Sequence, residues 1–373
     1  MINLRNGLKK YSEYIFGIYM VLLGILISGG FNSADMAYKV VFVICGLLWG
    51  IKLLLTDFSV KEIVGVVLIF VLLFVTFLTN REKTLILTAM AITGAKDVNL
   101  KKTFLWALIC KSITTIELMV LASLGFISNT ALMNTKDGVA TKNYCLGYQH
   151  PNLAFLNVLT LAFLVVLIWG EKLKWYVYLL LTAVMGTAYY VFKCRTGMLV
   201  WIAFIVGLIV YKLLKRLGKE KVYLYLFGLI PVVLSIFTAV SALLYKQGNS
   251  IMKSLNFKLH DRIAHVAKYP IEGINLFGSH VRVPFDNGFY HLVYNYGFIM
   301  AGLFMAAYTY AIIRLCQKKM GYEVLVLGLG ALVIYMEFAA LSIGQNYSLV
   351  FLSLALFGSY KEMWGNKNVR EGN

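Results

Sequence analysis

Two arginines in this chain have the type and setting for chemistry on an anion. Arg195 lies in FKCRTGM, a short connection between two apolar runs, and Arg262 lies in the polar stretch LHDRIAHVAKYPIEG, residues 259–273. A guanidinium donates hydrogen bonds in a planar fork that matches phosphate oxygens, and two such groups suit a diphosphate. Arg195 could instead anchor a helix end at a membrane surface, and Arg262 could pair with Asp261 or lipid headgroups.

Groups that could transfer a proton lie in the same part of the chain as Arg262. Asp286, His265 and His280 all belong to the stretch 246–287. A carboxylate or an imidazole within reach of a hydroxyl can act as its general base. Each of these residues could equally be a solvated side chain, and the sequence does not choose among them.

Other polar residues stand at or near the start of apolar runs, where they are candidates for substrate binding. They are His150, Asn152, Arg282, Asn287, His291 and Tyr294. Polar groups at membrane depth are often functional, although His150 could simply cap the helix that Pro151 opens, and others could join helices by hydrogen bonds. The His and Cys spacing fits no metal or redox motif, so we expect no metal and no cofactor.

Apolar runs must position all of these residues. Of the 373 residues 60% are hydrophobic and only 14% are charged, whereas roughly a quarter are charged in soluble domains. We expect an all-α, polytopic integral membrane protein with about twelve transmembrane helices, forming a single multi-pass domain over residues 1–373. The expected spans are 14–31, 37–55, 61–79, 84–95, 104–126, 152–170, 174–192, 197–214, 222–245, 288–313, 324–343 and 347–360.

The charge pattern orients these spans. The net charge of +18 sits mainly in short loops, which fits the positive-inside bias and anionic headgroups better than nucleic acid. Lys-rich segments such as GEKLKW and YKLLKRLGKEK then face the cytoplasm, as do both termini. The stretch 246–287 becomes a large extracytoplasmic loop.

The first half of that loop has a helical pattern. One apolar face is formed by Ile251, Leu255, Leu259, Ile263 and Val266, and another face by Lys258, Arg262 and His265. Such spacing predicts an amphipathic helix along the membrane surface.

At these residues the chain resembles the O-antigen polymerase and ligase superfamily of bacteria, most closely the Wzy-type polysaccharide polymerases. The resemblance rests on four ordered segments, GYQHPNLAF, CRTG, the loop with DRIAHVAKYPIEG, and DNGFYHLVYNYGFIMAG. Arg262 and Gly273, with ten residues between them, are similar to an arginine-to-glycine motif of polymerase outer loops. Related ligases have a His-Asn pair where this chain has Asp286-Asn287 and a Glu where it has Asn295, which disfavours a ligase.

The resemblance implies a metal-independent glycosyltransferase of GT-C-like architecture in the bacterial plasma membrane. A hydroxyl of one undecaprenyl-diphosphate-linked repeat unit would attack the anomeric carbon of a lipid-linked glycan and expel its lipid diphosphate. Arg195 and Arg262 would stabilise the departing anion. The implied partners are undecaprenyl-diphosphate-linked oligosaccharide and polysaccharide, membrane lipids, and chain-length regulator and flippase proteins, with no nucleic acid.

Two alternatives stay open at this point. One is an O-antigen ligase-type glycan transferase, and the other is a polysaccharide flippase or secondary transporter. Transporters often carry charged residues in the middle of their spans, and here Glu117 and Glu337 are the main candidates for such a position. The identity of the sugar, the linkage, and capsule versus O-antigen are not encoded in any recognisable pattern.

Overall fold

The computed structural model describes residues 8–31, 34–136, 139–259, 261–269 and 274–358. The chain is 78% helical with almost no sheet, which confirms the all-α expectation. Its α-helices are α2 (Ser12–Ser28), α3 (Met36–Leu55), α4 (Val60–Asn80), α5 (Thr84–Gly94), α6 (Leu100–Ser123), α7 (Pro151–Trp169), α8 (Trp175–Phe192), α9 (Arg195–Arg216), α10 (Glu220–Lys246), α11 (Ser250–Lys258), α12 (Arg262–Lys268), α13 (Gly288–His291), α14 (Gly297–Gln317), α15 (Gly321–Met336) and α16 (Leu354–Phe357). A π turn, η3 (Leu292–Tyr296), joins α13 to α14, and short 3-10 turns are η1 (Gly170–Lys172), η4 (Phe338–Leu341) and η5 (Tyr347–Ser353).

Many of these helices are suited to a bilayer. Among the described residues, eight helical segments are long and apolar enough to cross a membrane: α3, α4, α6, α7 with η1, α8, α9, α10 and α13 with α14. Four shorter apolar segments, α2, α5, α15 and η5 with α16, occupy the other predicted positions. A multi-pass membrane protein is therefore confirmed, and the number of twelve spans stays a prediction.

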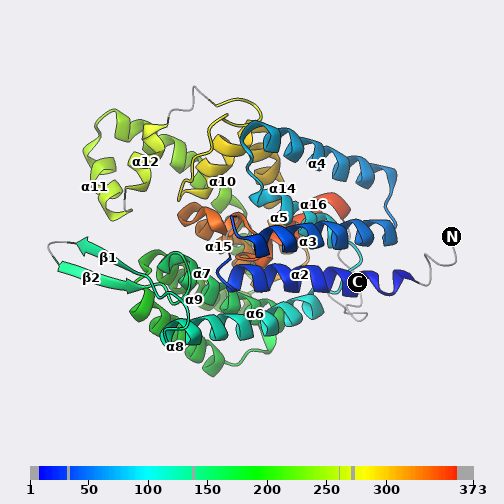
Figure 1. Cartoon of the computed structure of the whole chain (residues 1–373), viewed down its shortest axis with the longest axis horizontal. Helices are drawn as coiled ribbons and strands as arrows, with labels where there is room; N and C mark the ends of the chain where they lie inside the picture. Colours follow the sequence, from blue (N-terminus) through cyan, green and yellow to red (C-terminus); the bar gives the residue numbers. More distant parts are fainter. Residues whose placement is uncertain (1–7, 32–33, 137–138, 260, 270–273, 359–373) are drawn as a thin grey trace.

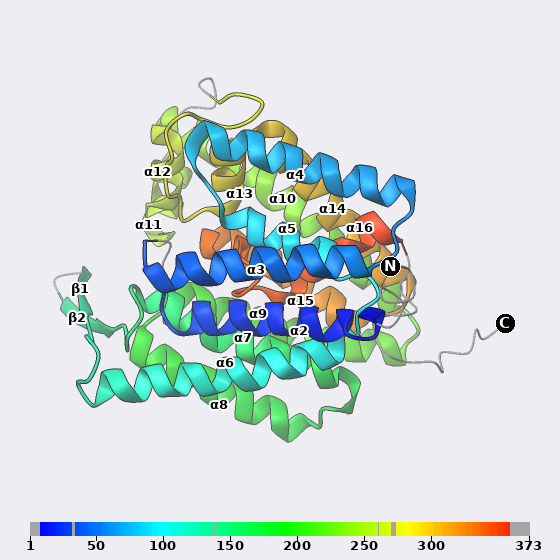
Figure 2. The same cartoon turned by 45° about the vertical axis from the view of Figure 1, so that its right-hand side comes forward.

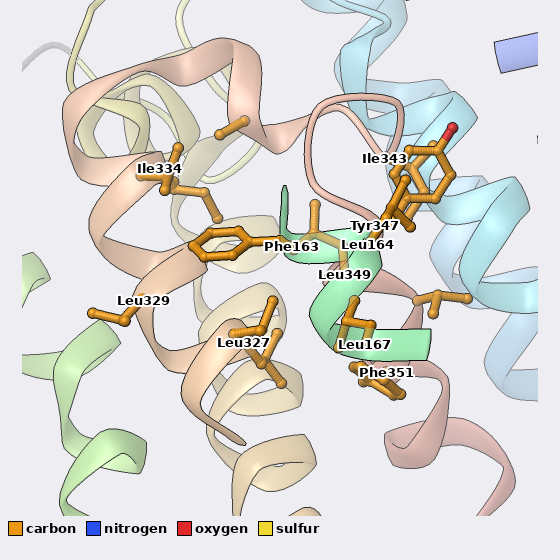
Figure 3. Close-up of a cluster of buried hydrophobic side chains, with 14 of the residues drawn as sticks. Phe163, Leu164, Leu167, Leu327, Leu329, Ile334, Ile343, Tyr347, Leu349 and Phe351 are labelled. Carbon is orange, nitrogen blue, oxygen red and sulfur yellow. The ribbon is translucent and has the colours of Figure 1, made fainter. Parts of the chain in front are cut away.

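Helices α7 and α15 form the centre of the bundle. In the most apolar 18-residue stretch of α7 with η1, 67% of the residues are buried inside the protein, compared with 17% in the corresponding stretches of α3 and α4. Figure 3 shows Phe163, Leu164 and Leu167 of α7 meeting Leu327 of α15 and Leu349 of η5. The peripheral helices instead expose leucine, isoleucine and valine, as helices that face lipid do.

Close helix packing at the centre depends on small residues. A Cβ atom added at Gly328 of α15 would lie 2.6 Å from the Phe227 ring of α10. Lipid tails are as apolar as a protein core, so helices in membranes associate largely through such close contact. Glycine at this position lets α10 and α15 approach each other.

The stretch between α10 and α13 departs from the expected single surface helix. It contains two short helices, because Asp261 adopts the left-handed conformation, with φ of 60°, between α11 and α12. The Asn256 amide holds this turn by donating to Asp261 Oδ1 at 2.7 Å and accepting from the Ala264 backbone N–H at 2.8 Å. The residues of the expected apolar face are divided between the two helices, with Ile251 of α11 69% exposed and Ile263 of α12 only 3% exposed, and an apolar face along the membrane surface stays a prediction.

A β-hairpin interrupts the otherwise helical chain between α6 and α7. Strands β1 (Ala131–Lys136) and β2 (Val139–Tyr144) pair antiparallel, with Ala131 opposite Tyr144. Figures 1 and 2 both show the hairpin at the same end of the bundle as α11 and α12. We call this the α12 end. The sequence interpretation contained no strand here, although Val, Thr and Tyr are frequent in strands.

Candidate functional site

Arg262 begins α12, and its guanidinium is turned into the protein. The side chain is 5% exposed, and Nε lies 3.7 Å from Oδ2 of Asp286, whose side chain is 55% exposed. Nη1 donates to the Leu259 carbonyl at 3.3 Å. A separation of 3.7 Å is too long for a hydrogen bond, and Nε has no acceptor among the described residues. A buried donor without an acceptor is costly, so the Nε–H group of Arg262 is available to donate to a bound anion.

Glu337 belongs to the same cluster. Helix α15 ends at Met336 and Glu337 follows it in an extended conformation, so this carboxyl lies beyond the helix rather than in the middle of the predicted span 324–343. The pKa of Glu337 is raised to about 7, chiefly by burial and further by the negative charge of Asp286. The charge of Arg262 and the hydrogen bond with the Asn152 side chain lower the pKa in part. Such a carboxyl exchanges its proton readily near neutral pH.

His150 and Asn152 reach this cluster from the start of α7. The His150 ring caps the helix, accepting at Nδ1 from the Asn152 backbone N–H at 3.1 Å, as the capping alternative predicted. Desolvation by the surrounding protein lowers the pKa of His150. The charge of Arg262 lowers this pKa further, and the charge of Asp286 raises it. The lowered pKa favours the neutral ring, and His150 lies within electrostatic range of the Arg262–Asp286 pair.

Arg195 lies beside the cluster, at the first position of α9. Its neighbour Cys194 lines a small cavity together with Asn152 and Glu337. Burial raises the pKa of the Cys194 thiol, which also senses the charges of Glu337 and Arg262. Arg195 itself is exposed, and no described residue forms an ion pair or hydrogen bond with it. The group formed by Arg262, Asp286, Glu337, His150 and Asn152 is called the Arg262 cluster below, and Arg195 adjoins it through Cys194.

Three predicted residues have other surroundings. The centroid of the His265 ring lies 5.1 Å from that of the Phe285 ring, and the centroid of the Tyr294 ring also lies 5.1 Å from that of Phe285. These contacts belong to an aromatic group that ties α12 to the π turn. His280 is exposed in the loop. His260 and Gly273, the end of the proposed arginine-to-glycine motif, lie outside the described residues.

Asn287 and Asn295 hold the loop that carries Asp286. Asn287 caps α13, accepting from the Phe289 and Tyr290 backbone N–H groups at 3.1 Å each, and its amide donates to Thr238 at 3.0 Å. Asn295 binds both backbone groups of Val283, accepting at 3.1 Å and donating at 2.8 Å. The Asn295 position is thus used for anchoring the loop.

Arg282 and His291 meet at a carboxylate that sequence reasoning did not select. Glu82 is buried, and its Oε2 lies 2.5 Å from Arg282 Nε and 3.7 Å from His291 Nε2. Burial would raise the pKa of Glu82, but His291, the Thr84 hydrogen bonds and Arg282 hold it below the ordinary value. Glu82, in the segment TNREK, is flanked by two cations and gave no signal of its own.

Lys111 is the other important residue that sequence reasoning missed. Its side chain is fully buried in α6 and donates a hydrogen bond to Oδ1 of Asn157. The Asn157 amide donates in turn to Thr115 and Tyr148, at 2.6 Å each. A lysine inside an apolar run was a readable signal, because charges within spans are rare and usually face the protein interior.

The described residues thus define a multi-pass α-helical membrane protein with a charged cluster at the α12 end of its bundle. They contain no group of three or more His, Cys, Asp and Glu residues that could hold a metal ion. Comparison of the chain with protein-family models, curated proteins and solved structures gives no match.

Proposed function

We propose that this protein is a polysaccharide polymerase, a glycosyltransferase that joins undecaprenyl-diphosphate-linked repeat units at the outer face of the bacterial plasma membrane. The observation that carries the proposal is the buried Arg262 guanidinium, which has a donor without an acceptor and lies next to two carboxyl groups. The ordered sequence segments that resemble Wzy-type polymerases support it, since four of the polar residues in them belong to the Arg262 cluster.

In this proposal the arginines act on the leaving group. The diphosphate of the donor lies against Arg262 and the exposed Arg195, while its lipid stays among the apolar helices. As the bond between the anomeric carbon and the diphosphate oxygen breaks, the added negative charge is stabilised by cations that are already in place. Arg262 is held from moving by burial and by its bond to Leu259.

The carboxyl groups act on the attacking hydroxyl. The hydroxyl oxygen of the second repeat unit forms the new bond to the anomeric carbon and gives its proton to a carboxylate. Asp286 and Glu337 are both in the Arg262 cluster, whereas His265 packs against aromatic rings and His280 is exposed in the loop. We therefore favour the two carboxyl groups as base candidates over the two histidines.

One observation favours a different class, a transporter of lipid-linked sugars. The buried Lys111 and its hydrogen-bonded partner Asn157 lie inside the bundle, and buried charge within spans is typical of transport proteins. A ligase would use the same chemistry as a polymerase with another acceptor.

Deleting the gene and separating the surface glycan on a gel tests the proposal. Loss of a polymerase leaves single repeat units on the cell surface and removes the long ladder. Loss of a ligase leaves polymer on the carrier lipid, and loss of a flippase traps single units inside the cell. A ladder of normal length in the deletion strain would contradict the proposed function.

A further inference from the structure

A second polar cavity opens near the Arg262 cluster. Its volume is about 220 Å³, and its walls come from four helix connections and the outer loop. The residues that line it and are used below are Tyr38, Arg81, Glu82, Lys83, Tyr148, Gln149, Arg282, Phe338 and Gln345. Glu82, Lys83 and Tyr148 stand beside the starts of α5 and α7, so the cavity lies at the α12 end of the bundle.

The walls of this cavity have an excess of positive charge. They contain three cations, Arg81, Lys83 and Arg282, and Glu82 as the acidic group. Glu82 is 1% exposed and is already bound to Arg282 and to the Thr84 hydroxyl and backbone N–H. The Glu82 carboxylate is therefore occupied by its ion pair with Arg282 and by its hydrogen bonds within the α4–α5 connection.

Arg81 and Lys83 are placed by aromatic rings. Arg81 Cζ lies 5.4 Å from the centroid of the Phe77 ring, and Lys83 Nζ lies 5.3 Å from that of Tyr38. Such cation–π contacts fix a cation without neutralising its charge. Glu82 Oε1 accepts from the Lys83 backbone N–H at 3.0 Å. In the part of the chain that the structure describes, no carboxylate forms an ion pair with the Arg81 guanidinium or the Lys83 ammonium, and so both side chains can serve an anion.

Gln345 adds a second kind of recognition to the same cavity. Its side chain is 5% exposed, and Oε1 has no hydrogen-bond donor among the described residues. Sugar hydroxyls are suitable donors for a buried amide oxygen, and Gln345 stands in the same wall as Gln149. The cavity thus combines features for a phosphate with features for a sugar.

Three chain segments contribute to both places. Gln149 lines the cavity, while the next residue, His150, belongs to the Arg262 cluster. In the outer loop, Arg282 lines the cavity and Asp286 belongs to the cluster. Glu337 and Phe338 are consecutive residues, one in the cluster and the other in the cavity wall. The two places therefore adjoin, separated by little more than the backbone of these segments.

We propose that this cavity binds the diphosphate and first sugar of a second polyprenyl-diphosphate-linked unit, opposite the unit held by the Arg262 cluster. This rests on the proposed polymerase function, which requires two lipid-linked substrates at once. Arg81 and Lys83 take the diphosphate, and Gln345 takes a sugar hydroxyl. Arg282 stays bound to Glu82 and shapes the wall between the two sites.

Native mass spectrometry of the protein with added undecaprenyl diphosphate tests the inference. The protein is kept in nanodiscs of phosphatidylcholine, which has no net charge. We expect two molecules to bind to the unaltered chain and one to the double variant Arg81→Gln/Lys83→Gln, whose second binding is weakened about tenfold or more. Lys39→Gln is the matched control, because Lys39 is exposed on α3 and does not line the cavity.

The variant Arg262→Gln separates this inference from the proposed function. Loss of one lipid in Arg262→Gln and of the other in the double variant supports both. Loss only in the double variant supports the cavity and contradicts the role of Arg262. Two lipids bound to the double variant would overturn the cavity inference and leave the proposed function standing.

Two further probes identify the source of the phosphate. Inorganic pyrophosphate and phosphatidylglycerol are titrated separately under the same conditions. We expect neither to displace the second undecaprenyl diphosphate at equal concentration, since neither supplies both a lipid diphosphate and a polyprenyl chain. Displacement by either one at equal concentration would show a general anion site and contradict the inference.

Discussion

Arg262 and Asp286 form an unequal pair, in which the cation is 5% exposed and the carboxylate 55% exposed at a separation of 3.7 Å. A carboxylate in contact with water gains little from a distant partner, so Asp286 can turn away from Arg262 at small cost. The buried guanidinium cannot leave in the same way. The pair is therefore suited to opening for an incoming anion.

Replacing Arg262 by Gln should abolish the long glycan ladder, with a loss of polymer of about 100-fold or more. Arg262→Lys should restore only a small part, because an ammonium lacks the planar fork that binds two phosphate oxygens. The measurement is glycan gel analysis with immunoblotting of membranes for protein amount. Lys258→Gln, on the exposed end of α11, is the charge-matched control, and polymer of normal length in Arg262→Gln would contradict the assigned role.

Replacing Arg195 by Ala should lower polymer about tenfold or more without changing thermal stability in detergent. The reason is that Arg195 is exposed and has no ion-pair partner in the described chain, so its removal breaks no internal contact. Lys193→Ala is the control two residues away, because Lys193 is an exposed cation lying over the Tyr190 ring. Equal polymer in the two variants would argue against phosphate binding by Arg195.

Glu337 should make activity and stability depend on pH in opposite directions. Its pKa is raised from 4.5 to about 7, so the folded protein binds this proton more tightly than the unfolded chain. The contribution to stability is present below about pH 4.5 and is lost as pH rises to about pH 7, by on the order of 1–3 kcal/mol. A base role would instead make polymer synthesis rise through about pH 7.

Glu337→Gln should remove both effects. Thermal unfolding in detergent from about pH 5 to about pH 9 should show a smaller decline for the variant than for the unaltered chain. Polymer synthesis by purified protein should be low and lack the rise near neutral pH. A variant with full activity and the same pH profile would leave Asp286 as the base candidate in the cluster.

Asn295→Ala should free the loop that carries Asp286. The change removes both hydrogen bonds to the Val283 backbone, each worth about 1 kcal/mol, and leaves a buried backbone group unsatisfied. We expect faster hydrogen exchange in residues 279–286 and reduced polymer, with α7 unchanged. Asn295→Asp would set a buried carboxylate oxygen against the Val283 carbonyl, so it should disturb the loop at least as much as Asn295→Ala, whereas unchanged exchange in Asn295→Ala would contradict the anchoring role.

Lys111→Met should distinguish a polymerase from a transporter. Lys111 has no ion-pair partner among the described residues, so Lys111→Met leaves no opposite charge unpaired, and Asn157 keeps its bonds to Thr115 and Tyr148. A polymerase should therefore keep its ladder in this variant, as measured on the same gels. A normal protein level with loss of the ladder would favour a transport role for the Lys111–Asn157 pair.

The helical segments could be predicted well because they depend on local composition. Apolar runs of bilayer length give helices wherever the chain must satisfy its backbone within lipid, and the ends of α8 and α10 lie close to the predicted boundaries. The break at Asp261 was not readable, because it depends on the side chain of Asn256 reaching over a turn. A helical pattern in the sequence does not reveal such a competing hydrogen bond.

The candidate site was only partly predictable. Arg262, Asp286 and His150 were selected by residue type and position, and the structure places them together. Glu337 was assigned to the middle of a span, because it follows an uninterrupted apolar run and hydropathy cannot show that the helix stops before it. The Arg282–Glu82 contact joins residues 200 positions apart, and no pattern within one sequence encodes a pairing of that kind.

The consecutive residues Glu337 and Phe338 contribute to different sites, and the Phe338 ring stacks on His291 at 4.6 Å. If the cluster and the cavity hold two substrates as proposed, the single residue between Met336 and Phe338 determines which of the two meets the carboxyl group. A single inserted residue here would shift the acid from the cluster toward the cavity, although one residue among 373 hardly changes the composition or overall hydropathy of the protein. Length variation should be poorly tolerated at this point and well tolerated in the β-hairpin.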